Sequence, residues 1–148
     1  MADDTDVLVA YYIEQWNQAR HVEDQRATVT NIVMLIASAI VGFIVQKGLS
    51  REMLPITIML TVLGIYGAIA SEKLYERFQF FVNRGGRLSR RVDELHPNCK
   101  LVEINRDFEI QHKKEYPRLS RIRLHILWLS LHLAIALGGL ALSILALA

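Results

Sequence analysis

The fold is decided by residues 29–70, in which two uncharged apolar runs, VTNIVMLIASAIVGFIV (29–45) and MLPITIMLTVLGIYGAIA (53–70), flank the polar break QKGLSRE (46–52). As a helix, a run of 17 or 18 residues extends roughly 26 Å, which is close to the bilayer's hydrocarbon thickness of about 30 Å. A third run, residues 124–148, is also uncharged when its histidines are neutral. The sequence therefore predicts an all-α integral membrane protein with three transmembrane helices plus amphipathic cytoplasmic helices.

A soluble helical bundle is the alternative, because 52% hydrophobic residues in a chain of 148 would allow one. A soluble helix carries polar residues at every turn, whereas here the charge is pooled between three uncharged blocks. This pooling favours lipid as the solvent. Because Asp3, Asp4 and Asp6 replace the basic start of a secretory signal, we expect the first run to remain in the mature protein.

The basic residues are distributed unevenly along the chain. Residues 71–123 hold 13 of the 17 basic residues against 8 acidic ones. Since Lys and Arg near span ends are retained in the cytoplasm, we expect a membrane protein with a cytoplasmic N-terminus and cytoplasmic residues 72–120. The turn between the first two spans and the C-terminus then face outward. One cysteine, Cys99, excludes an intrachain disulfide.

Four segments follow from this pattern: an N-terminal amphipathic cytoplasmic helix (1–27), a transmembrane hairpin (28–71), a charged cytoplasmic helical segment (72–120) and a third transmembrane helix (121–148). No proline or glycine separates the first segment from the first span, so we expect one continuous helix. Beyond the second span the helix should also continue into the cytoplasm. Gly85 and Gly86 predict a hinge or break there, since each costs about 1 kcal/mol relative to Ala. Pro97 should end the helix.

Each span gathers small and polar residues on one side of a helical wheel. The stripes are Thr28, Asn31, Ser38, Gly42 and Gln46 in the first span, Thr57, Thr61, Gly64, Ala68 and Ser71 in the second, and His125, His132, Ala136, Gly139 and Ser143 in the third. Such a stripe either packs helices together or faces a water-filled lumen when several copies assemble. Three spans do not enclose a conduit, so a pore requires a ring of protomers.

Four stripe residues are candidates for lining or gating a pore: Asn31, Ser38, His125 and His132. An ionisable His132 inside a span should face protein or water, which makes it a functional candidate. The alternative is a neutral histidine hydrogen-bonded to Thr57, Thr61 or Ser38.

Four arginines near an aromatic residue form a basic patch, Arg84, Arg87, Arg90 and Arg91 with Phe78, for which we expect contact with a partner or with lipid. Nucleic acid is a less favoured ligand, because the positive-inside rule already predicts such a cluster. The spacing of Arg106, Asp107 and His112 resembles a ribonuclease motif of HEPN domains, but other Arg and His pairs fit it equally well. With no catalytic motif and no second pair beside His96 and Cys99 to complete a zinc site, we expect no enzyme, metal or cofactor.

A helix that enters a transmembrane hairpin and continues as Lys73, Leu74, Tyr75, Glu76, Arg77 and Phe78 into arginine-rich turns resembles small bacterial membrane proteins of phage defence. Families with a similar layout are the octameric membrane accessory protein family of type VI CRISPR systems and the SLATT-type two-span effectors. The resemblance covers Trp16 to about Leu95 and lies in architecture and charge pattern. The third span departs from the two-span pattern.

This resemblance implies a ring-forming, pore-type effector that permeabilises or depolarises the inner membrane when infection is sensed. Its expected partners are membrane lipid, further copies of the chain and a protein of the same defence system. The alternative function is a membrane scaffold that recruits a partner protein through its cytoplasmic helices.

Overall fold

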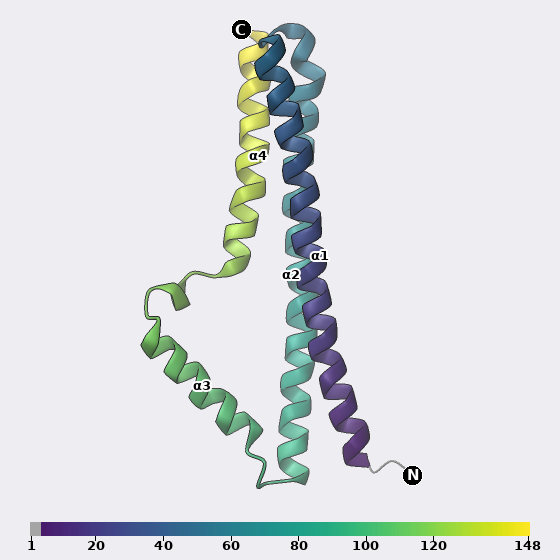
Figure 1. The fold of residues 1–148 in the computed structure, drawn as a ribbon, viewed down its shortest axis with the longest axis vertical. Helices are drawn as coiled ribbons and strands as arrows, with labels where there is room; N and C mark the ends of the chain where they lie inside the picture. The colour runs from purple at the N-terminus through teal and green to yellow at the C-terminus, as the bar shows by residue number, and fades with distance from the viewer. Residues whose placement is uncertain (1–3) are drawn as a thin grey trace. The chain divides into compact units, whose positions relative to one another are not determined.

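A computed structural model describes residues 4–148, and every regular element in that part of the chain is helical. The elements are α1 (Asp4–Lys47), the 3-10 turn η1 (Arg51–Met53), α2 (Leu54–Leu95), α3 (Leu101–Glu115), the 3-10 turn η2 (Leu119–Arg121) and α4 (Leu124–Leu147) (Figure 1). The predicted all-α fold is confirmed. The N-terminal helix runs into the first apolar run without a break, as predicted.

The described residues contain three helices that are long and apolar enough to cross a membrane. They are α1, the segment of η1 with α2, and α4. These are the three spans that the sequence predicted, and they imply contact with lipid.

Gly48 and Pro55 shape the turn between α1 and α2. Gly48 has φ +82°, a conformation that L side chains rarely adopt, and its N–H donates to the carbonyl oxygen of Ile44 at 2.9 Å. A glycine in this left-handed conformation is a common helix C-cap. Pro55 lies in the first turn of α2, where its missing N–H costs no intrahelical hydrogen bond.

The expected hinge at Gly85 and Gly86 is wrong, because α2 continues through both residues to Leu95. Packing accounts for the difference. A Cβ on Gly85 would lie 3.5 Å from the indole nitrogen of Trp16, so α1 lies closely against α2 at this point. Such contacts outweigh the low helix propensity of glycine, since most helical stability in proteins comes from tertiary packing.

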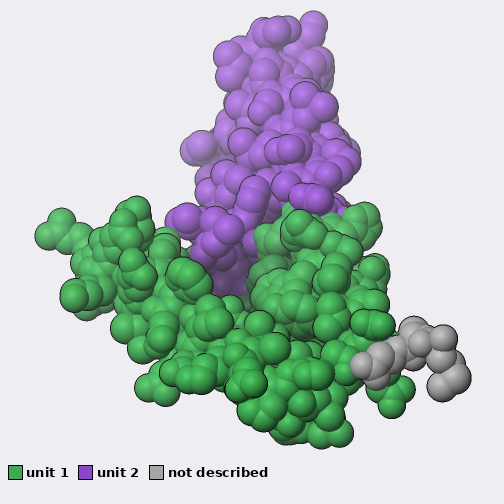
Figure 2. Space-filling view, turned by 60° about the horizontal axis from the view of Figure 1, so that its bottom comes forward, with its two compact units in different colours: residues 1–23, 76–123 green, residues 24–75, 124–148 purple. Residues whose placement is uncertain are grey.

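The contacts divide the chain into two compact units (Figure 2). Unit 1 comprises residues 1–23 and 76–123, and unit 2 comprises residues 24–75 and 124–148. Unit 2 therefore contains the three apolar runs. Unit 1 contains α3, residues 4–23 of α1 and residues 76–95 of α2.

Within unit 2, α2 and α4 run antiparallel with a constant register. The residues that meet are Thr57 with Ser143, Thr61 with Gly139, Gly64 with Ala136, Gly67 with His132, and Tyr75 with His125. A Cβ added at Gly64 or Gly139 would lie closer than 3.0 Å to the backbone of the facing helix. The two backbones thus approach as closely as glycine permits at these two positions, within a contact that extends over roughly 27 Å of helix. We call this contact the α2–α4 seam.

Helix α1 packs on this pair through one face. Its buried residues recur at intervals of three and four: Thr30, Val33, Ala37, Ile40 and Ile44. Three of them form an apolar cluster with Leu60 of α2, against which Ile135 and Leu142 of α4 also pack. Unit 2 is therefore a three-helix bundle without a lumen of its own.

In unit 1, the carboxylate of Asp93 caps the N-terminus of α3. Its two oxygens accept hydrogen bonds from the backbone N–H groups of Leu101 at 2.8 Å and Val102 at 2.9 Å. No residue of α3 is buried. This helix is thus held mainly at its first turn, where the acceptor also favours the positive end of the helix dipole.

The α2–α4 seam predicts different effects for two adjacent glycines of α4. A Cβ on Gly139 would clash with the backbone of Thr61, whereas a Cβ on Gly138 meets nothing within 4 Å. We expect Gly139→Ala to lower the free energy of unfolding by about 1–3 kcal/mol, the usual cost of overpacking. Thermal unfolding of the detergent-solubilised protein measures this, with Gly138→Ala as the matched control. Equal stability of the two variants would contradict the seam.

Candidate functional site

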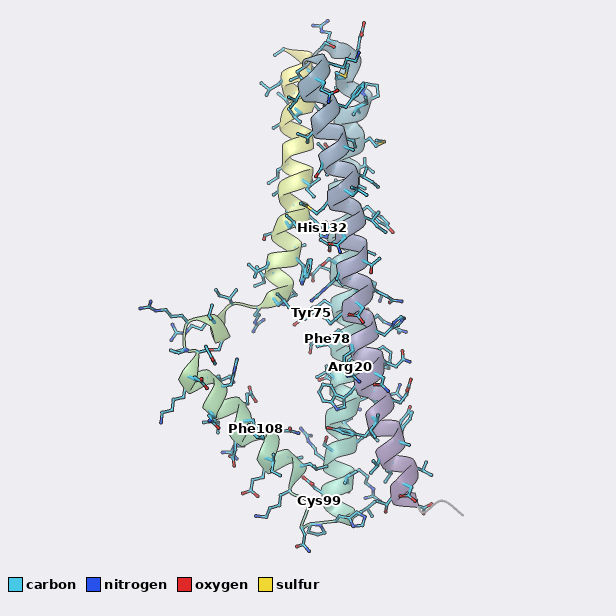
Figure 3. The ribbon with its side chains drawn as sticks, viewed as in Figure 1. Arg20, Tyr75, Phe78, Cys99, Phe108 and His132 are labelled. Carbon is cyan, nitrogen blue, oxygen red and sulfur yellow. The ribbon has the colours of Figure 1, made fainter. Side chains whose placement is uncertain are left out.

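His132 lies in the third turn of α4 and is completely buried within unit 2 (Figure 3). Its Nε2 is 3.2 Å from the hydroxyl of Thr30 on α1, and that hydroxyl donates its one hydrogen to the carbonyl oxygen of Arg26 at 2.9 Å. The threonine oxygen can therefore only accept from the imidazole, which places the imidazole hydrogen on Nε2. The predicted alternative partners Thr57, Thr61 and Ser38 are not used.

Gly67 makes room for this imidazole. A Cβ at that position would lie closer than 3.0 Å to Cε1 of His132. The second ring nitrogen, Nδ1, is buried and has no hydrogen-bond partner among the described residues. His132 therefore connects α4 to α1 while lying against the backbone of α2.

Arg26 forms a second connection between the three helices. Its guanidinium carbon lies 5.9 Å from the ring centroid of Tyr75 on α2 and 5.7 Å from that of Trp128 on α4. The ring of His125 stacks on the ring of Tyr75, with 4.1 Å between the two centroids. A buried cation between two aromatic rings gains about 2 kcal/mol or more when it is desolvated.

Several buried polar atoms in the same part of the bundle have no hydrogen-bond partner among residues 4–148. They are Ser71 Oγ, Glu72 Oε1, Trp128 Nε1 and His132 Nδ1. By the register of the α2–α4 seam, these residues flank one another at the end of the bundle where α4 begins. Together with Arg26 they form the buried polar junction.

The polar stripe of α1 lies on the exposed side of that helix. Thr28, Asn31, Ser38, Gly42 and Gln46 are all exposed. At 100° per residue, they lie roughly opposite the buried face of α1. We call them the α1 polar face, which Leu35, 72% exposed, interrupts.

Two hydroxyls of the α1 polar face are satisfied by their own helix. Thr28 donates to the carbonyl oxygen of Asp24 at 2.9 Å, and Ser38 donates to that of Met34 at 2.7 Å. The side-chain amide of Asn31 makes no hydrogen bond to any residue from 4 to 148. By contrast, the exposed residues of α2 from Ile58 to Ile69 are aliphatic or aromatic.

The four pore or gate candidates thus fall into two groups. Asn31 and Ser38 share the α1 polar face, whereas His132 is buried and His125 is half-buried against Tyr75. The stripes of α2 and α4 are buried against one another in the seam. Within one protomer, the stripes of α2 and α4 therefore pack helices together. The stripe of α1 differs, because its residues are exposed.

Members of the predicted basic patch differ in their surroundings. Arg84 donates to the hydroxyl of Tyr11 and lies 5.2 Å from the ring centroid of Phe80. Arg91 pairs with Glu94 at 2.6 Å. The other patch members, Arg87 and Arg90, are exposed, and Phe78 is half-buried.

Unit 1 also contains a groove of about 540 Å³ that the sequence did not predict. It is lined by Trp16 of α1, by Val82, Gly86, Ser89 and Arg90 of α2, and by Val102, Asn105, Arg106 and Glu109 of α3. Glu109 pairs with Lys113 at 2.5 Å. This hydrogen bond and the lysine charge lower the pKa of Glu109, so its carboxylate stays ionised.

Arg106 and His112, which fit the loose ribonuclease spacing, lie in different surroundings. They are six positions apart on α3 and therefore project about 120° apart. Arg106 lines the groove, whereas the ring of His112 lies 5.2 Å from that of Tyr116. Within residues 4–148, no group of three or more His, Cys, Asp or Glu residues is placed to hold a metal ion.

Sequence reasoning missed three residues of the buried polar junction, Arg26, Glu72 and Trp128, and also Tyr75, whose ring lies against Arg26. The spacing of Arg26, Thr30 and Val33 would have placed the arginine on the packed face of α1. The groove carries no such signal, because its lining comes from three segments that are distant in the sequence.

No protein-family model, curated protein or solved structure matches this chain. The resemblance of residues 16–95 to phage-defence membrane proteins therefore stays a prediction.

The buried polar junction predicts an energetic coupling between α1 and α4. We expect Thr30→Val and His132→Leu to be coupled by about 0.6 kcal/mol, with an upper value near 1.7, as measured for hydrogen bonds between membrane helices. A double-mutant cycle on unfolding in mixed micelles measures this. Thr28→Val, which changes an exposed threonine of the same helix, should show no coupling to His132→Leu. Coupling of equal size in both cycles would refute the assignment.

Proposed function

We propose that this chain forms a homo-oligomeric pore in the bacterial inner membrane and that the α1 polar face lines its lumen. Support comes from the location of polar residues on the three candidate spans. The polar stripes of α2 and α4 pack against one another, while the polar stripe of α1 lies on an exposed side of that helix. This contrast is the observation that carries the proposal.

Hydrocarbon is a poor environment for the α1 polar face. The amide of Asn31 has no partner among residues 4–148, and an unsatisfied polar group in the bilayer core costs several kcal/mol. Water in a lumen, or the same face of a neighbouring copy, removes this cost. One bundle has no lumen, whereas a ring of protomers provides a water-filled lumen and places neighbouring copies beside one another.

We assign gating to His132 and His125, which lie behind the α1 polar face. His132 and His125 connect α4 to α1 and α2, so a change in these contacts would rotate α1 relative to its neighbours. We propose that Asn31 and Ser38 face the permeating species and that the two histidines hold the closed arrangement. No catalytic step belongs to this function.

The resemblance to phage-defence proteins supports a role in antiviral defence. In this role the pore would depolarise or permeabilise the membrane when a signal reaches the cytoplasmic helices. Arg87 and Arg90 are exposed and available to lipid headgroups or a partner protein of the defence system.

A scaffold is the second candidate function. It is favoured by the exposed apolar side chains of α3, among which Phe108 is 67% exposed and Ile110 is 54% exposed (Figure 3). A scaffold predicts a filled centre of the assembly and loss of the partner on Leu74→Glu or Phe78→Glu. A pore predicts an axial opening in an image of the detergent-solubilised assembly.

The native cysteine tests the proposed topology. Cys99 is exposed and belongs to the segment that we place in the cytoplasm. We expect a membrane-impermeant maleimide to label it only after the cells are lysed. In a Cys99→Ser background, Ser50→Cys in the outer turn should react with intact cells. Labelling of Cys99 in intact cells would invert the topology.

Conductance tests the pore. We expect the reconstituted assembly to release ions from liposomes and to conduct in planar bilayers. Asn31→Leu and Ser38→Leu should each reduce single-channel conductance severalfold, because they replace polar groups along the lumen. Ser130→Leu, which changes an exposed serine of α4, is the matched control. Absence of conductance from an intact assembly, or an equal effect of Ser130→Leu, would refute the assignment.

A further inference from the structure

We propose that the groove of unit 1 binds a small organic anion with a planar ring, of the size and chemistry of a mononucleotide. Its volume of about 540 Å³ lies within the range of about 300–1,000 Å³ that is usual for small-molecule sites. All its lining residues belong to one compact unit. This site goes beyond the pore proposed above and does not depend on it.

Gly86 provides the first observation. A glycine inside a helix lowers stability relative to Ala, so its presence needs a compensating reason. Packing within the chain supplies none, because a Cβ on Gly86 meets nothing within 4 Å. Gly86 instead forms part of the groove wall, where a side chain would fill the space.

The second observation is the charge of the groove. Arg90 of α2 and Arg106 of α3 both line it, and neither forms an ion pair or hydrogen bond with another residue from 4 to 148. The acidic residue of the lining, Glu109, is paired with Lys113. Two available guanidinium groups match an oxyanion such as a phosphate, which they can bind with paired hydrogen bonds.

Trp16 provides the third observation. Its side chain is 39% exposed and lies against α2 beside Gly85, while its ring meets Tyr12 edge to face at 6.2 Å between centroids. An aromatic face in a groove is a stacking platform for a planar ring. The groove thus joins a ring-binding surface to two cations.

The attachment of α3 indicates what binding would do. Asp93 fixes the first turn of α3 through two hydrogen bonds. No residue of α3 is buried. An anion that contacts Arg90 and Arg106 together would hold the body of α3 against α2. We therefore expect the ligand to order α3.

The test uses the full chain in detergent and the fluorescent nucleotide mant-ATP as probe, with energy transfer from tryptophan as the signal. We expect saturable binding that unlabelled ATP displaces and that inorganic phosphate at the same concentration does not. Arg90→Gln and Arg106→Gln should each weaken binding roughly tenfold or more. Arg87→Gln, an exposed arginine that does not line the groove, is the matched control and should bind normally.

Gly86→Ala separates a ligand site from a structural role. We expect it to raise the melting temperature, because alanine is the better helix former, and to weaken binding of mant-ATP. Absence of saturable binding, equal displacement by phosphate, or an equal loss in Arg87→Gln would overturn the proposal. Gly86→Ala with lower stability and unchanged binding would also overturn it.

Discussion

Close contact between the backbones of α2 and α4 is the constraint on which unit 2 depends. In lipid, apolar side chains gain little by leaving the solvent, so helices associate through close packing and interhelical hydrogen bonds. Gly64 and Gly139 permit this approach, because a Cβ on either would overlap the facing backbone. The hydrogen bond of 2.9 Å from Ser143 to Thr57 lies in the same register. Small and polar residues thus hold together two helices that expose aliphatic side chains outward.

The seam also determines what is left for α1. With the stripes of α2 and α4 buried against one another, α1 packs through its opposite face, and its polar residues lie outside the bundle. His132 and Arg26 extend the polar contacts to α1 at the end where α4 begins. The bundle thus has a packed core and one polar side on its exposed surface.

Unit 1 lies outside the three apolar runs. The helices α1 and α2 continue out of the apolar runs, and α3 is attached to α2 through the carboxylate of Asp93. Glycines that the sequence marks as a hinge instead admit Trp16 to the surface of α2 and leave open a groove with two arginines. Both glycines lower helix propensity. Gly85 lies against Trp16, and Gly86 leaves open space in the groove.

The sequence by itself determined the three apolar helices, their lengths and the continuity of α1. An uncharged apolar run of 17 residues or more is typical of a helix long enough to span a membrane. It also indicated the end of the long helix, since α2 stops at Leu95, two residues before Pro97. Only the tertiary structure decided which polar stripe is buried. Helical periodicity places a stripe on a face, but the identity of its neighbour depends on contacts between distant segments. The partner of His132 is Thr30, 102 positions away, and this distance is the physical reason that local pattern did not identify it.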